Sequence, residues 1–535
     1  MRRLFLFIAA LVCTSVVFAA DYANVIVPRP VKCRAVEGEF ILTPKTVVRA
    51  EVQSLVGAAT IFSEDLAAVT GSKLAVKRST VKSGAISLAL ESSLQPEEYR
   101  LNISKDGVRI VGGTERAVFY GLQSLLQIAA ASDAVKGGVA LCGVEISDKP
   151  HFEYRGSLFD VCRHIFTVEE VKKYIDILAL HKCNKFHWHL TEDQGWRIEI
   201  KRYPELSAVG AYRNETLVGR NRRSKIYDNT RYGGVFTQDQ VRDIVAYAAA
   251  RYIDVIPEIE MPGHAIAALT TYPELGCTGG PYEVWTRWGI SKDIFCAGKE
   301  STFEFIENVL TEVLELFPYK YIHIGGDEAP RDAWKKCPHC QKRIKEEGLK
   351  DENQLQSYFM ERVERWLAER GRKIIGWDEI LQGGISKSAT VMSWRGSKGG
   401  IAAAKLGNQV IMTPNTHCYI DYYQTSDHKA NGEPLGNGRF PVTLRKTYEL
   451  DPYAELNEEQ QKFIEGVQVI LWTEYISTFG HVQHMLLPRL AALAETGWSY
   501  GNKDYDDFAR RMHILRRLYD KQGFNHAPYF FDGIE

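Results

Sequence analysis

The sequence has little of the features that mark unusual structural classes. Of its 535 residues only 19 are proline, 43 are glycine and ten are cysteine. These levels exclude a collagen-like, low-complexity or wholly disordered chain, and cysteine is too sparse for a disulfide scaffold. Basic and acidic residues nearly balance, for a formal net charge of −1. No overall field therefore attracts nucleic acid or an anionic membrane, and we expect neither as a partner.

Long apolar runs are also missing, apart from one at the amino terminus. Residues 1–3 are a basic start (Met-Arg-Arg), residues 4–18 are mostly apolar, and residues 17–19 (Val-Phe-Ala) fit a small-residue cleavage rule. Because this run is too short to cross a bilayer, it predicts a secretory signal peptide over residues 1–19. No later segment approaches about 18 uncharged apolar residues. We therefore expect no membrane span and a periplasmic or extracellular protein.

Residues 20–148 alternate short β-rich runs with turns and two helical patterns. The β-rich runs include residues 46–50, 85–90 and 107–112, and apolar residues at helical spacing cover 52–70 and 115–131. These periodicities predict an α+β domain. It contains no cluster of titratable groups, so we expect it to support its neighbour.

From residue 149 to 535 the pattern changes to strand then helix, repeated. Eight short apolar segments are predicted as strands, at residues 154–159, 185–190, 253–259, 321–325, 373–377, 390–394, 409–413 and 467–472. Amphipathic segments lie between them. Strands that are apolar on both faces, with intervening helices, indicate a (β/α)8 TIM barrel. The fold prediction is thus an α/β barrel catalytic domain preceded by a smaller α+β domain. The long stretch 416–465 predicts an elaborated loop near the site.

The predicted strand ends carry acids, arginine and histidine beside tryptophan or tyrosine. Catalytic groups of such barrels lie at the carboxyl ends of the strands. The residues found there are Asp160, Arg163, His187, His189, Glu192, Asp193, Glu258, Glu260, His264, His323, Asp327, Glu328, Trp377, Asp378, Glu379, Trp394, Arg395, Tyr419, Asp421, Trp472 and Glu474. Aromatic rings pack on the apolar face of a pyranose, and carboxylates and arginine bind its hydroxyls. This composition predicts a sugar site.

Two adjacent acids, Asp327 and Glu328, follow Gly325 and Gly326 at the fourth strand end. Neighbouring residues of an extended chain point to opposite sides. We therefore expect these acids to be poorly placed as an acid and nucleophile that face each other about 5 Å apart. One acid would protonate the leaving oxygen while the other orients something else.

Several segments, in order, resemble one known family. They are residues 159–164, 187–197, 257–264, 323–328 (His-Ile-Gly-Gly-Asp-Glu), 376–379, 393–396 and 471–474. Together they resemble glycoside hydrolase family 20, the β-N-acetylhexosaminidases, over nearly the whole chain beyond residue 19. Residues 119–123 are similar to the α+β domain that precedes the barrel in this family.

The resemblance implies an exo-acting β-N-acetylhexosaminidase that removes terminal, non-reducing β-linked GlcNAc or GalNAc from glycans, with no metal or cofactor. It implies a retaining, substrate-assisted mechanism, which the usual two-carboxylate scheme does not cover. Glu328 would be the general acid and then the general base. Asp327 would hold the 2-acetamido group so that its carbonyl oxygen attacks the anomeric carbon and forms an oxazolinium. Tyr419 would hydrogen-bond that oxygen.

The same resemblance assigns the remaining site residues. The acetamido pocket would be lined by Trp377, Trp394 and Trp472. The sugar hydroxyls would be bound by Arg163, Asp421 and Glu474. His264 would connect to Glu328 through a polar network and tune its acidity. Glu192 stands where the family more often has Asp, so the acidic member of the network is either Glu192 or Asp193. Nothing in the sequence indicates the oligomeric state, or whether a GlcNAc or a GalNAc residue is preferred.

Two rival interpretations come from other chemistries. His187 and His189 resemble the His-x-His of metal-dependent barrel hydrolases. That class needs further histidines from later strands, whereas the fifth and sixth strands end in tryptophan. A third possibility is a sugar-binding relative without catalytic activity. The presence of Asp327, Glu328 and Tyr419 together argues against it.

The other rival is thiol chemistry. Cys337 and Cys340 have the spacing of exported thiol oxidases, but they follow a barrel strand end rather than the first strand of a βαβ unit. We expect a local disulfide or thiol pair that stiffens a loop, or half of a metal site. Cys277 and Cys296 bracket a loop rich in glycine and tryptophan, and we expect them to pair.

Overall fold

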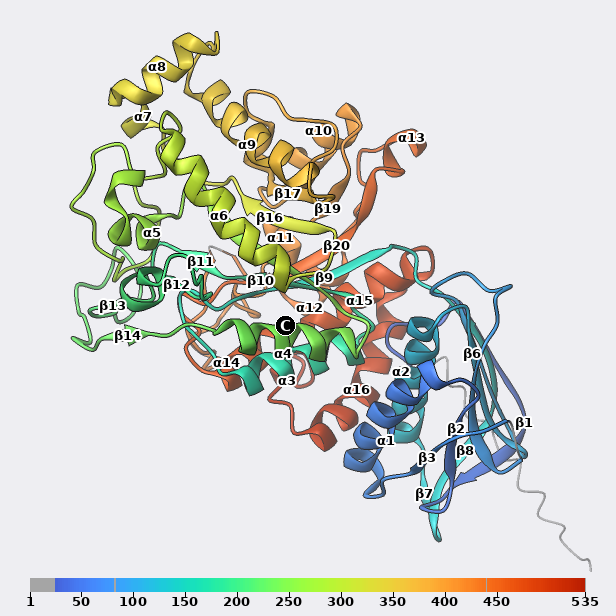
Figure 1. Ribbon diagram of the computed structural model, residues 1–535. Coiled ribbons are helices and arrows are strands. Elements are labelled where there is room, and N and C mark those ends of the chain that lie inside the picture. The colour runs from blue at the N-terminus through green and yellow to red at the C-terminus, as the bar shows by residue number, and fades with distance from the viewer. Residues whose placement is uncertain (1–24, 81–82, 439, 535) are drawn as a thin grey trace, which may run out of the picture.

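The computed structural model describes residues 25–80, 83–438 and 440–534, and the signal peptide predicted at residues 1–19 lies outside them. Two units lie side by side (Figure 1), a sheet covered by helices and a closed barrel. The amino-terminal unit ends with strand β8 (Gly138–Asp148) and the barrel begins with strand β9 (Tyr154–Asp160).

The amino-terminal unit is one mixed sheet with helices on one face. Its strands run in the order β1-β8-β5-β6-β4-β2-β3, and β7 pairs with β8. The other strands are β1 (Lys32–Leu42), β2 (Val47–Ala50), β3 (Ala75–Arg78), β4 (Ala85–Leu90), β5 (Tyr99–Ser104), β6 (Gly107–Gly112) and β7 (Ala134–Val135). Helices α1 (Val56–Thr70) and α2 (Glu115–Ala131) pack together against it. The Thr114 hydroxyl caps α2 by accepting a hydrogen bond from the Ala117 amide, the usual role of threonine at this position.

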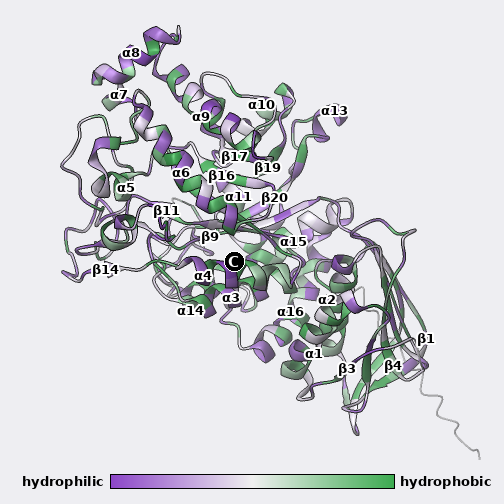
Figure 2. Ribbon diagram, in the orientation of Figure 1, coloured by the Kyte–Doolittle hydropathy of each residue, from purple (hydrophilic) through white to green (hydrophobic). Residues whose placement is uncertain are grey.

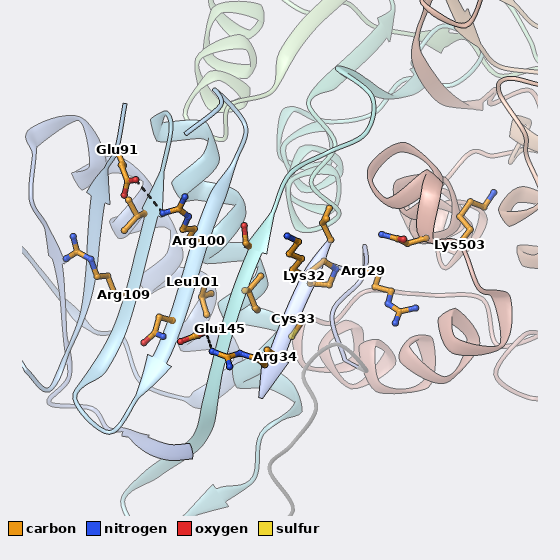
Figure 3. Close-up of a pocket in the computed structure, with 17 residues that line it drawn as sticks. Arg29, Lys32, Cys33, Arg34, Glu91, Arg100, Leu101, Arg109, Glu145 and Lys503 are labelled. Atoms are coloured by element: carbon orange, nitrogen blue, oxygen red, sulfur yellow. Dashed lines mark hydrogen bonds and ion pairs between the residues drawn. The ribbon is translucent and has the colours of Figure 1, made fainter. Parts of the chain in front are cut away.

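The outer face of this sheet carries a cavity of about 1010 Å³ (Figure 3). Several arginines line it, but Arg34 pairs with Glu145 at 2.5 Å and Arg100 with Glu91 at 3.5 Å. No histidine or paired acids occur among the lining residues. This cavity therefore offers paired surface charges rather than a catalytic group.

The second unit is a closed barrel of eight parallel strands, in the order β10-β15-β16-β17-β18-β19-β20-β9. Besides β9, the strands are β10 (Lys185–His189), β15 (Asp254–Met261), β16 (Tyr321–Gly325), β17 (Lys373–Trp377), β18 (Thr390–Ser393), β19 (Val410–Met412) and β20 (Ile464–Leu471). Each of the eight predicted segments coincides with one of them to within a few residues. The predicted α/β barrel with a preceding domain is confirmed.

Helices surround the barrel, and most of the longer ones carry both hydrophobic and hydrophilic residues (Figure 2). They are α3 (Val168–Leu180), α4 (Gln238–Ala249), α5 (Ile266–Thr271), α6 (Glu300–Leu316), α7 (Asp332–Lys336), α8 (Pro338–Glu346), α9 (Glu352–Ala368), α10 (Lys398–Leu406), α11 (Asn415–Cys418), α12 (Leu444–Tyr448), α13 (Glu458–Gln461), α14 (Phe479–Leu486), α15 (Arg489–Ser499) and α16 (Tyr505–Gln522). In α6 the buried residues Phe305, Val309 and Val313 recur at helical spacing, which turns one side inward. Within the described part of the chain, no helix has the length and apolar character needed to cross a membrane.

Short hairpins and helices extend the loops at one end of the barrel. The hairpins pair β11 (Thr191–Glu192) with β12 (Gly195–Trp196) and β13 (Tyr212–Arg213) with β14 (Tyr232–Gly233). Between β19 and β20 the chain forms α11, α12 and α13. This is the elaborated loop that the long stretch 416–465 predicts.

Buried polar groups join the two units. Asp148, at the end of β8, accepts hydrogen bonds from the Tyr99 hydroxyl at 2.7 Å and the Trp498 indole at 2.9 Å. It also pairs with the fully buried Lys182 at 3.3 Å. Buried charges are tolerated only when they are paired and hydrogen-bonded in this way. The junction is therefore specific, and it holds the sheet in one position against the barrel.

The expected disulfide between Cys277 and Cys296 is absent, because both thiols are free. Cys337 and Cys340 are free as well, so the local disulfide is the one alternative expected for them that is wrong. The physical reason is that the fold brings these two pairs of residues together into one cluster, with a closest sulfur–sulfur distance of 3.5 Å between Cys296 and Cys340.

Candidate active site

The fourth strand end, after β16, has a backbone that only glycine permits at two positions. Gly325 and Gly326 have φ of 64° and 96°. A Cβ on Gly325 would lie 1.8 Å from a Glu260 carboxylate oxygen, and one on Gly326 would lie 2.4 Å from Ile380 Cγ2. Glu328 also has a positive φ, 41°, which is strained for a residue with a side chain. The chain thus turns sharply where the two acids begin.

This turn brings both acids to one imidazole. His264 Nε2 lies 3.5 Å from Asp327 Oδ2 and 3.6 Å from Glu328 Oε2. The expectation that the two side chains point to opposite sides is therefore wrong, because it assumed an extended backbone and Glu328 is left-handed. Asp327 is buried, whereas the Glu328 side chain is 35% exposed. One acid lies deep in the site and the other at its mouth.

His264 connects the acids to a buried carboxylate pair. Its Nδ1 lies 2.7 Å from Glu192 Oε1 and 3.5 Å from Asp193 Oδ2. Burial alone lowers the pKa of His264, but the Glu192 charge and hydrogen bonds with Asp193, Asp327 and Glu192 raise it well above the usual value. The imidazole is thus cationic between two pairs of carboxylates. His264 lies within 3.6 Å of both acids and of the Glu192 carboxylate.

The structure distinguishes the two candidates for the acidic member of this network. Glu192 makes the shorter contact to His264 and also pairs with Arg163 at 3.0 Å. Asp193 instead accepts hydrogen bonds from the backbone amides of Ile266 and Ser291, each at 3.1 Å. Glu192 therefore connects the histidine to the arginine, and Asp193 fixes the surrounding loops.

Arg163 is held in place from three sides. Its guanidinium pairs with Asp160 at 3.2 Å and with Glu192, and it lies 4.8 Å from the Trp472 ring centre. Burial lowers the pKa of Arg163, but the charges of Glu192, Asp160 and Glu474 raise it well above the usual value. A fixed, charged fork of this kind suits hydrogen bonding to adjacent hydroxyls.

Four aromatic residues from three strand ends and the long loop come together. Trp377 and Trp472 lie 5.9 Å apart at 52°, and Trp394 stacks on Tyr419 at 6.0 Å and 24°. Tyr419 pairs in a parallel bridge with Ile470 of β20, so the long loop is anchored to the barrel. Burial raises the pKa of Tyr419 well above the usual value, against a hydrogen bond from Trp472. Its hydroxyl therefore keeps its proton and can donate it.

Carboxylate oxygens without protein partners line the same region. Both oxygens of Asp421, Oδ1 of Asp327 and Oε2 of Glu474 are buried with no hydrogen-bond partner among the described residues. Burial, and then the Glu474 charge, raise the pKa of Asp421 well above the usual value. Buried polar atoms are nearly always hydrogen-bonded, so these oxygens mark where donors of a ligand would fit.

Glu379 lies in the same region, although the sequence analysis assigns it no role beyond its place at a strand end. Its Oε2 accepts a hydrogen bond from the Trp394 indole at 2.9 Å. Burial, and then the charges of Asp327 and Asp378, raise the pKa of Glu379 to about 8. A neutral acid therefore lies near Asp327 at neutral pH. The available signal was its position two residues after Trp377.

Asp160 is a second such residue. It accepts hydrogen bonds from the Thr473 amide and hydroxyl at 3.1 and 3.0 Å and lies 3.1 Å from His189 Nδ1. It also pairs with Arg163. Asp160 thus fixes the first and eighth strand ends to each other. The spacing of an acid and an arginine three residues apart after β9 was the signal for this role.

His187 and His189, the histidines of the rival metal interpretation, are fully buried. His189 contacts Asp160 and Glu260. His187 Nε2 and His323 Nδ1 lie 3.0 and 2.8 Å from the two oxygens of Glu258, which also accepts the Trp377 indole hydrogen bond at 2.8 Å. Burial is the main cause that lowers the pKa of His187 to about 4. These groups form a buried polar layer against Trp377, in which Glu258 Oε2, His187 Nε2 and His323 Nε2 have no hydrogen-bond partner among the described residues.

Comparisons with known proteins agree with this geometry. Models of the glycosyl hydrolase family 20 catalytic domain and of its domain 2 match residues 152–500 and 23–149. A β-hexosaminidase of Porphyromonas gingivalis is 44% identical over 94% of this chain, which spans 64% of that relative. A β-hexosaminidase of Akkermansia muciniphila is 34% identical, covering 80% of this chain and 86% of the relative.

Solved structures give the same result. A family 20 exo-β-N-acetylglucosaminidase from Vibrio harveyi, in complex with N-acetylglucosamine, has a TM-score of 0.83 at 30% identity, covering 95% of this chain and 79% of its own. A β-N-acetylhexosaminidase from Bacteroides fragilis has a TM-score of 0.80 at 33% identity, covering 94% of this chain and 97% of its own.

Proposed function

The chain belongs to glycosyl hydrolase family 20, and from this premise we propose that it is an exo-acting β-N-acetylhexosaminidase with a retaining, substrate-assisted mechanism. Its substrate would be a glycan that ends in a non-reducing, β-linked GlcNAc or GalNAc residue. One observation carries the proposal: Asp327 and Glu328 meet at His264 beside a wall of four aromatic rings.

The aromatic wall suits the acetamido group of such a sugar. Trp377, Trp394 and Trp472 supply apolar surface for its methyl group, and Tyr419 supplies a protonated hydroxyl for its carbonyl oxygen. Asp327 has a buried oxygen, Oδ1, without a protein partner. The amide N–H can donate to Asp327 while the carbonyl oxygen accepts from Tyr419, and the amide is then oriented toward the anomeric carbon.

In the first chemical step, one bond to the anomeric carbon forms and another breaks. The amide carbonyl oxygen attacks, the glycosidic bond breaks, and Glu328 transfers its proton to the leaving oxygen. The amide becomes an oxazolinium whose positive charge is stabilised by the Asp327 carboxylate. The partial exposure of Glu328 allows the departing glycan to leave on the solvent side.

The second step restores the enzyme. Glu328, now ionised, takes a proton from a water molecule that attacks the anomeric carbon, and the oxazolinium opens back to the acetamide. Both steps invert the anomeric carbon, so the product keeps the β configuration. His264 remains cationic between the acids and keeps both carboxyl groups in position as the charge of Glu328 changes.

The remaining polar groups suit the hydroxyls of a terminal sugar. Arg163 can donate a forked pair of hydrogen bonds, and Asp421 and Glu474 have buried oxygens that can accept from hydroxyls. Buried groups of this kind around the sugar hydroxyls would suit the end of a glycan chain rather than its middle, which supports exo action. We also propose export to the periplasm or the extracellular space, on the basis of residues 1–19.

An aryl β-GlcNAc and the matching aryl β-glucoside, which differ only at carbon 2, test the proposal. We expect rapid release of the aryl group from the β-GlcNAc compound and almost none from the β-glucoside, which lacks the internal nucleophile. NMR of the first product should show the β anomer. Comparable rates on the β-glucoside, or an α first product, would contradict the proposed function.

A further inference from the structure

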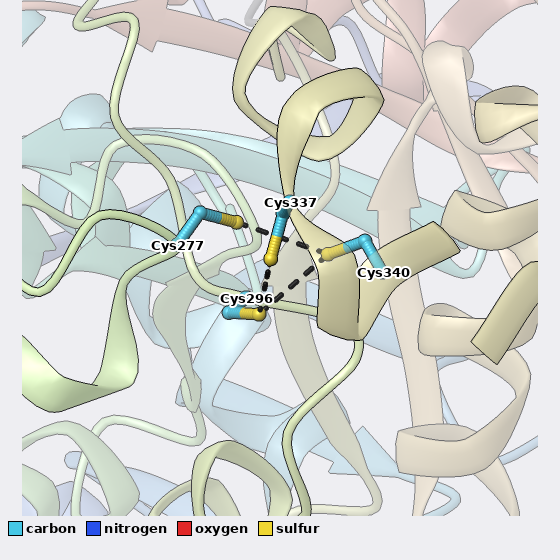
Figure 4. A group of neighbouring side chains, drawn as sticks. All are labelled: Cys277, Cys296, Cys337 and Cys340. Atoms are coloured by element: carbon cyan, nitrogen blue, oxygen red, sulfur yellow. Dashed lines mark hydrogen bonds between the residues drawn. The ribbon is translucent and has the colours of Figure 1, made fainter. Parts of the chain in front are cut away.

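Four cysteines from two neighbouring loops meet at one point (Figure 4). Cys277 and Cys296 belong to the connection between α5 and α6, and Cys337 and Cys340 lie at the start of α8. The Sγ atoms of Cys277 and Cys340 are 3.8 Å apart, and Cys296 Sγ lies 3.6 Å from Cys337 Sγ and 3.5 Å from Cys340 Sγ. All four sulfurs lie within 4.8 Å of one another.

These distances match a tetrahedron of sulfurs around one metal ion. A Zn–S bond of about 2.3 Å places the sulfurs of a tetrahedral site about 3.8 Å apart. A disulfide would need about 2.05 Å between two of them, and none of the four residues is bonded to another. Cys296, Cys337 and Cys340 are buried and Cys277 is partly buried. The cluster is therefore closed, as structural zinc sites are.

The local backbone is arranged to hold the cluster together. Gly276 pairs with Phe295 in an antiparallel bridge, which draws together the two ends of the loop that carries Cys277 and Cys296. Pro338 begins α8, and the two-residue spacing places Cys340 about one turn from Cys337. A Cβ on Gly298 would lie 2.2 Å from the carbonyl carbon of His339, so only glycine lets the two loops approach this closely.

A backbone amide is directed at one of the four sulfurs. The Gly298 amide donates a hydrogen bond to the sulfur of Cys296. Amide-to-sulfur hydrogen bonds of this kind stabilise a charged sulfur ligand. A buried indole contact lies nearby, since Trp334 Nε1 donates to the Phe295 carbonyl at 2.9 Å.

We propose that Cys277, Cys296, Cys337 and Cys340 together bind one Zn²⁺ ion as a closed structural site. Binding converts four thiols into thiolates and releases four protons. The ion joins the connection that follows β15, which carries His264, to the connection that follows β16, which carries Asp327 and Glu328. It holds these loops in register and takes no part in the chemistry, because a four-sulfur site leaves no open position.

Metal analysis of the intact protein, purified from its full gene without chelator or reductant, is the direct test. We expect about one zinc per chain. After denaturation with a chelator and no reductant, an alkylating agent should modify all four cysteines, as peptide mass spectrometry would show. Peptides joined by a disulfide within the cluster, a metal-free protein with free thiols, or iron in place of zinc would each overturn the assignment.

Single variants then locate the ion. Cys337→Ser and Cys340→Ser should lose most of the zinc and melt at lower temperature. Cys183→Ser, which changes another buried cysteine, should keep the metal. Zinc retained in full by Cys337→Ser and Cys340→Ser would place the ion elsewhere and refute the site.

Cobalt substitution of the unaltered chain gives a result that does not depend on how the variants fold. The Co²⁺ form should show the visible bands of tetrahedral cobalt and a near-ultraviolet thiolate-to-cobalt charge-transfer band. A cobalt protein without that charge-transfer band would contradict sulfur ligation.

Discussion

At the scale of single residues, the two adjacent acids have separate tasks because their surroundings differ. Asp327 is buried and reaches His264 from within, while Glu328 is partly exposed at the mouth. Glu379 adds a neutral carboxyl group next to this pair. Opposed environments of this kind are how one site assigns different roles to similar groups.

The general-acid role of Glu328 gives a prediction that depends on the leaving group. Glu328→Gln should lower kcat by ~10²–10⁴-fold for substrates with a poor leaving group. The loss should be smaller for aryl substrates whose leaving group needs little protonation, and inhibitor binding should stay near normal. Steady-state rates over a series of leaving groups measure this, and an equal loss across the series would argue against the role.

The raised pKa of Glu379 gives a prediction for stability against pH. Burial and the nearby charges raise this pKa from 4.5 to about 8. Between these two values the folded state keeps a proton on Glu379 that the unfolded state loses. The contribution of this protonated group to stability is full below pH 4.5 and is lost as the pH rises through about 8.

Glu379→Gln removes this titration and keeps an acceptor for Trp394. As the pH rises from about 4.5 to about 8, the melting temperature of the variant should increase relative to that of the parent. Thermal melts across this range check it. A difference that stays constant with pH would mean that Glu379 is ionised in the folded protein.

At the scale of elements, the end of β16 depends on a tight turn. A Cβ at Gly326 would lie 2.4 Å from Ile380 Cγ2, and the residue has a φ of 96°. The turn that presents Asp327 and Glu328 is therefore fixed by close packing against the connection after β17.

Gly326→Ala should destabilise the fold by about 1–3 kcal/mol more than a glycine-to-alanine substitution that adds backbone strain at a positive φ but no steric contact. Gly371→Ala is the matched control, because Gly371 has a φ of 72° and nothing within 4 Å of a built Cβ. Chemical denaturation of both variants gives the comparison. Equal losses would show that the contact with Ile380 relaxes freely.

Much of the element scale could be predicted from the sequence. Each barrel strand is buried on both faces and reads as a short apolar run, and α2 has the predicted bounds because Thr114 caps it. The left-handed φ of Glu328 could not be predicted, since it depends on packing around Gly325 and Gly326. Beyond the possibility that Cys337 and Cys340 form half of a metal site, the cysteine cluster could not be predicted, because Cys277 and Cys340, 63 residues apart, meet only after the loops fold.

At the scale of the whole molecule, the amino-terminal sheet is fixed to the barrel by buried charge. Asp148 receives the Tyr99 and Trp498 hydrogen bonds and pairs with Lys182, whose side chain is completely buried. Helix α16 packs on α1 and α2 and closes the same junction (Figure 1).

Asp148→Ala should therefore destabilise the protein by about 3–5 kcal/mol, because it leaves the buried Lys182 without its counter-charge. Asp133→Ala changes an exposed acid of the same unit and should have little effect. Denaturation curves measure both. If the Asp148 variant were as stable as the Asp133 variant, the junction would not depend on this ion pair.

The central claim is that the acetamido group of the substrate is the nucleophile and that Asp327 orients it. The most direct measurement compares kcat/KM for aryl β-N-acetylglucosaminides with zero, one, two or three fluorines on the acetyl group. Each fluorine makes the carbonyl oxygen less nucleophilic, so we predict a steep, regular fall in the rate. A rate that does not depend on fluorination would contradict substrate assistance in this enzyme.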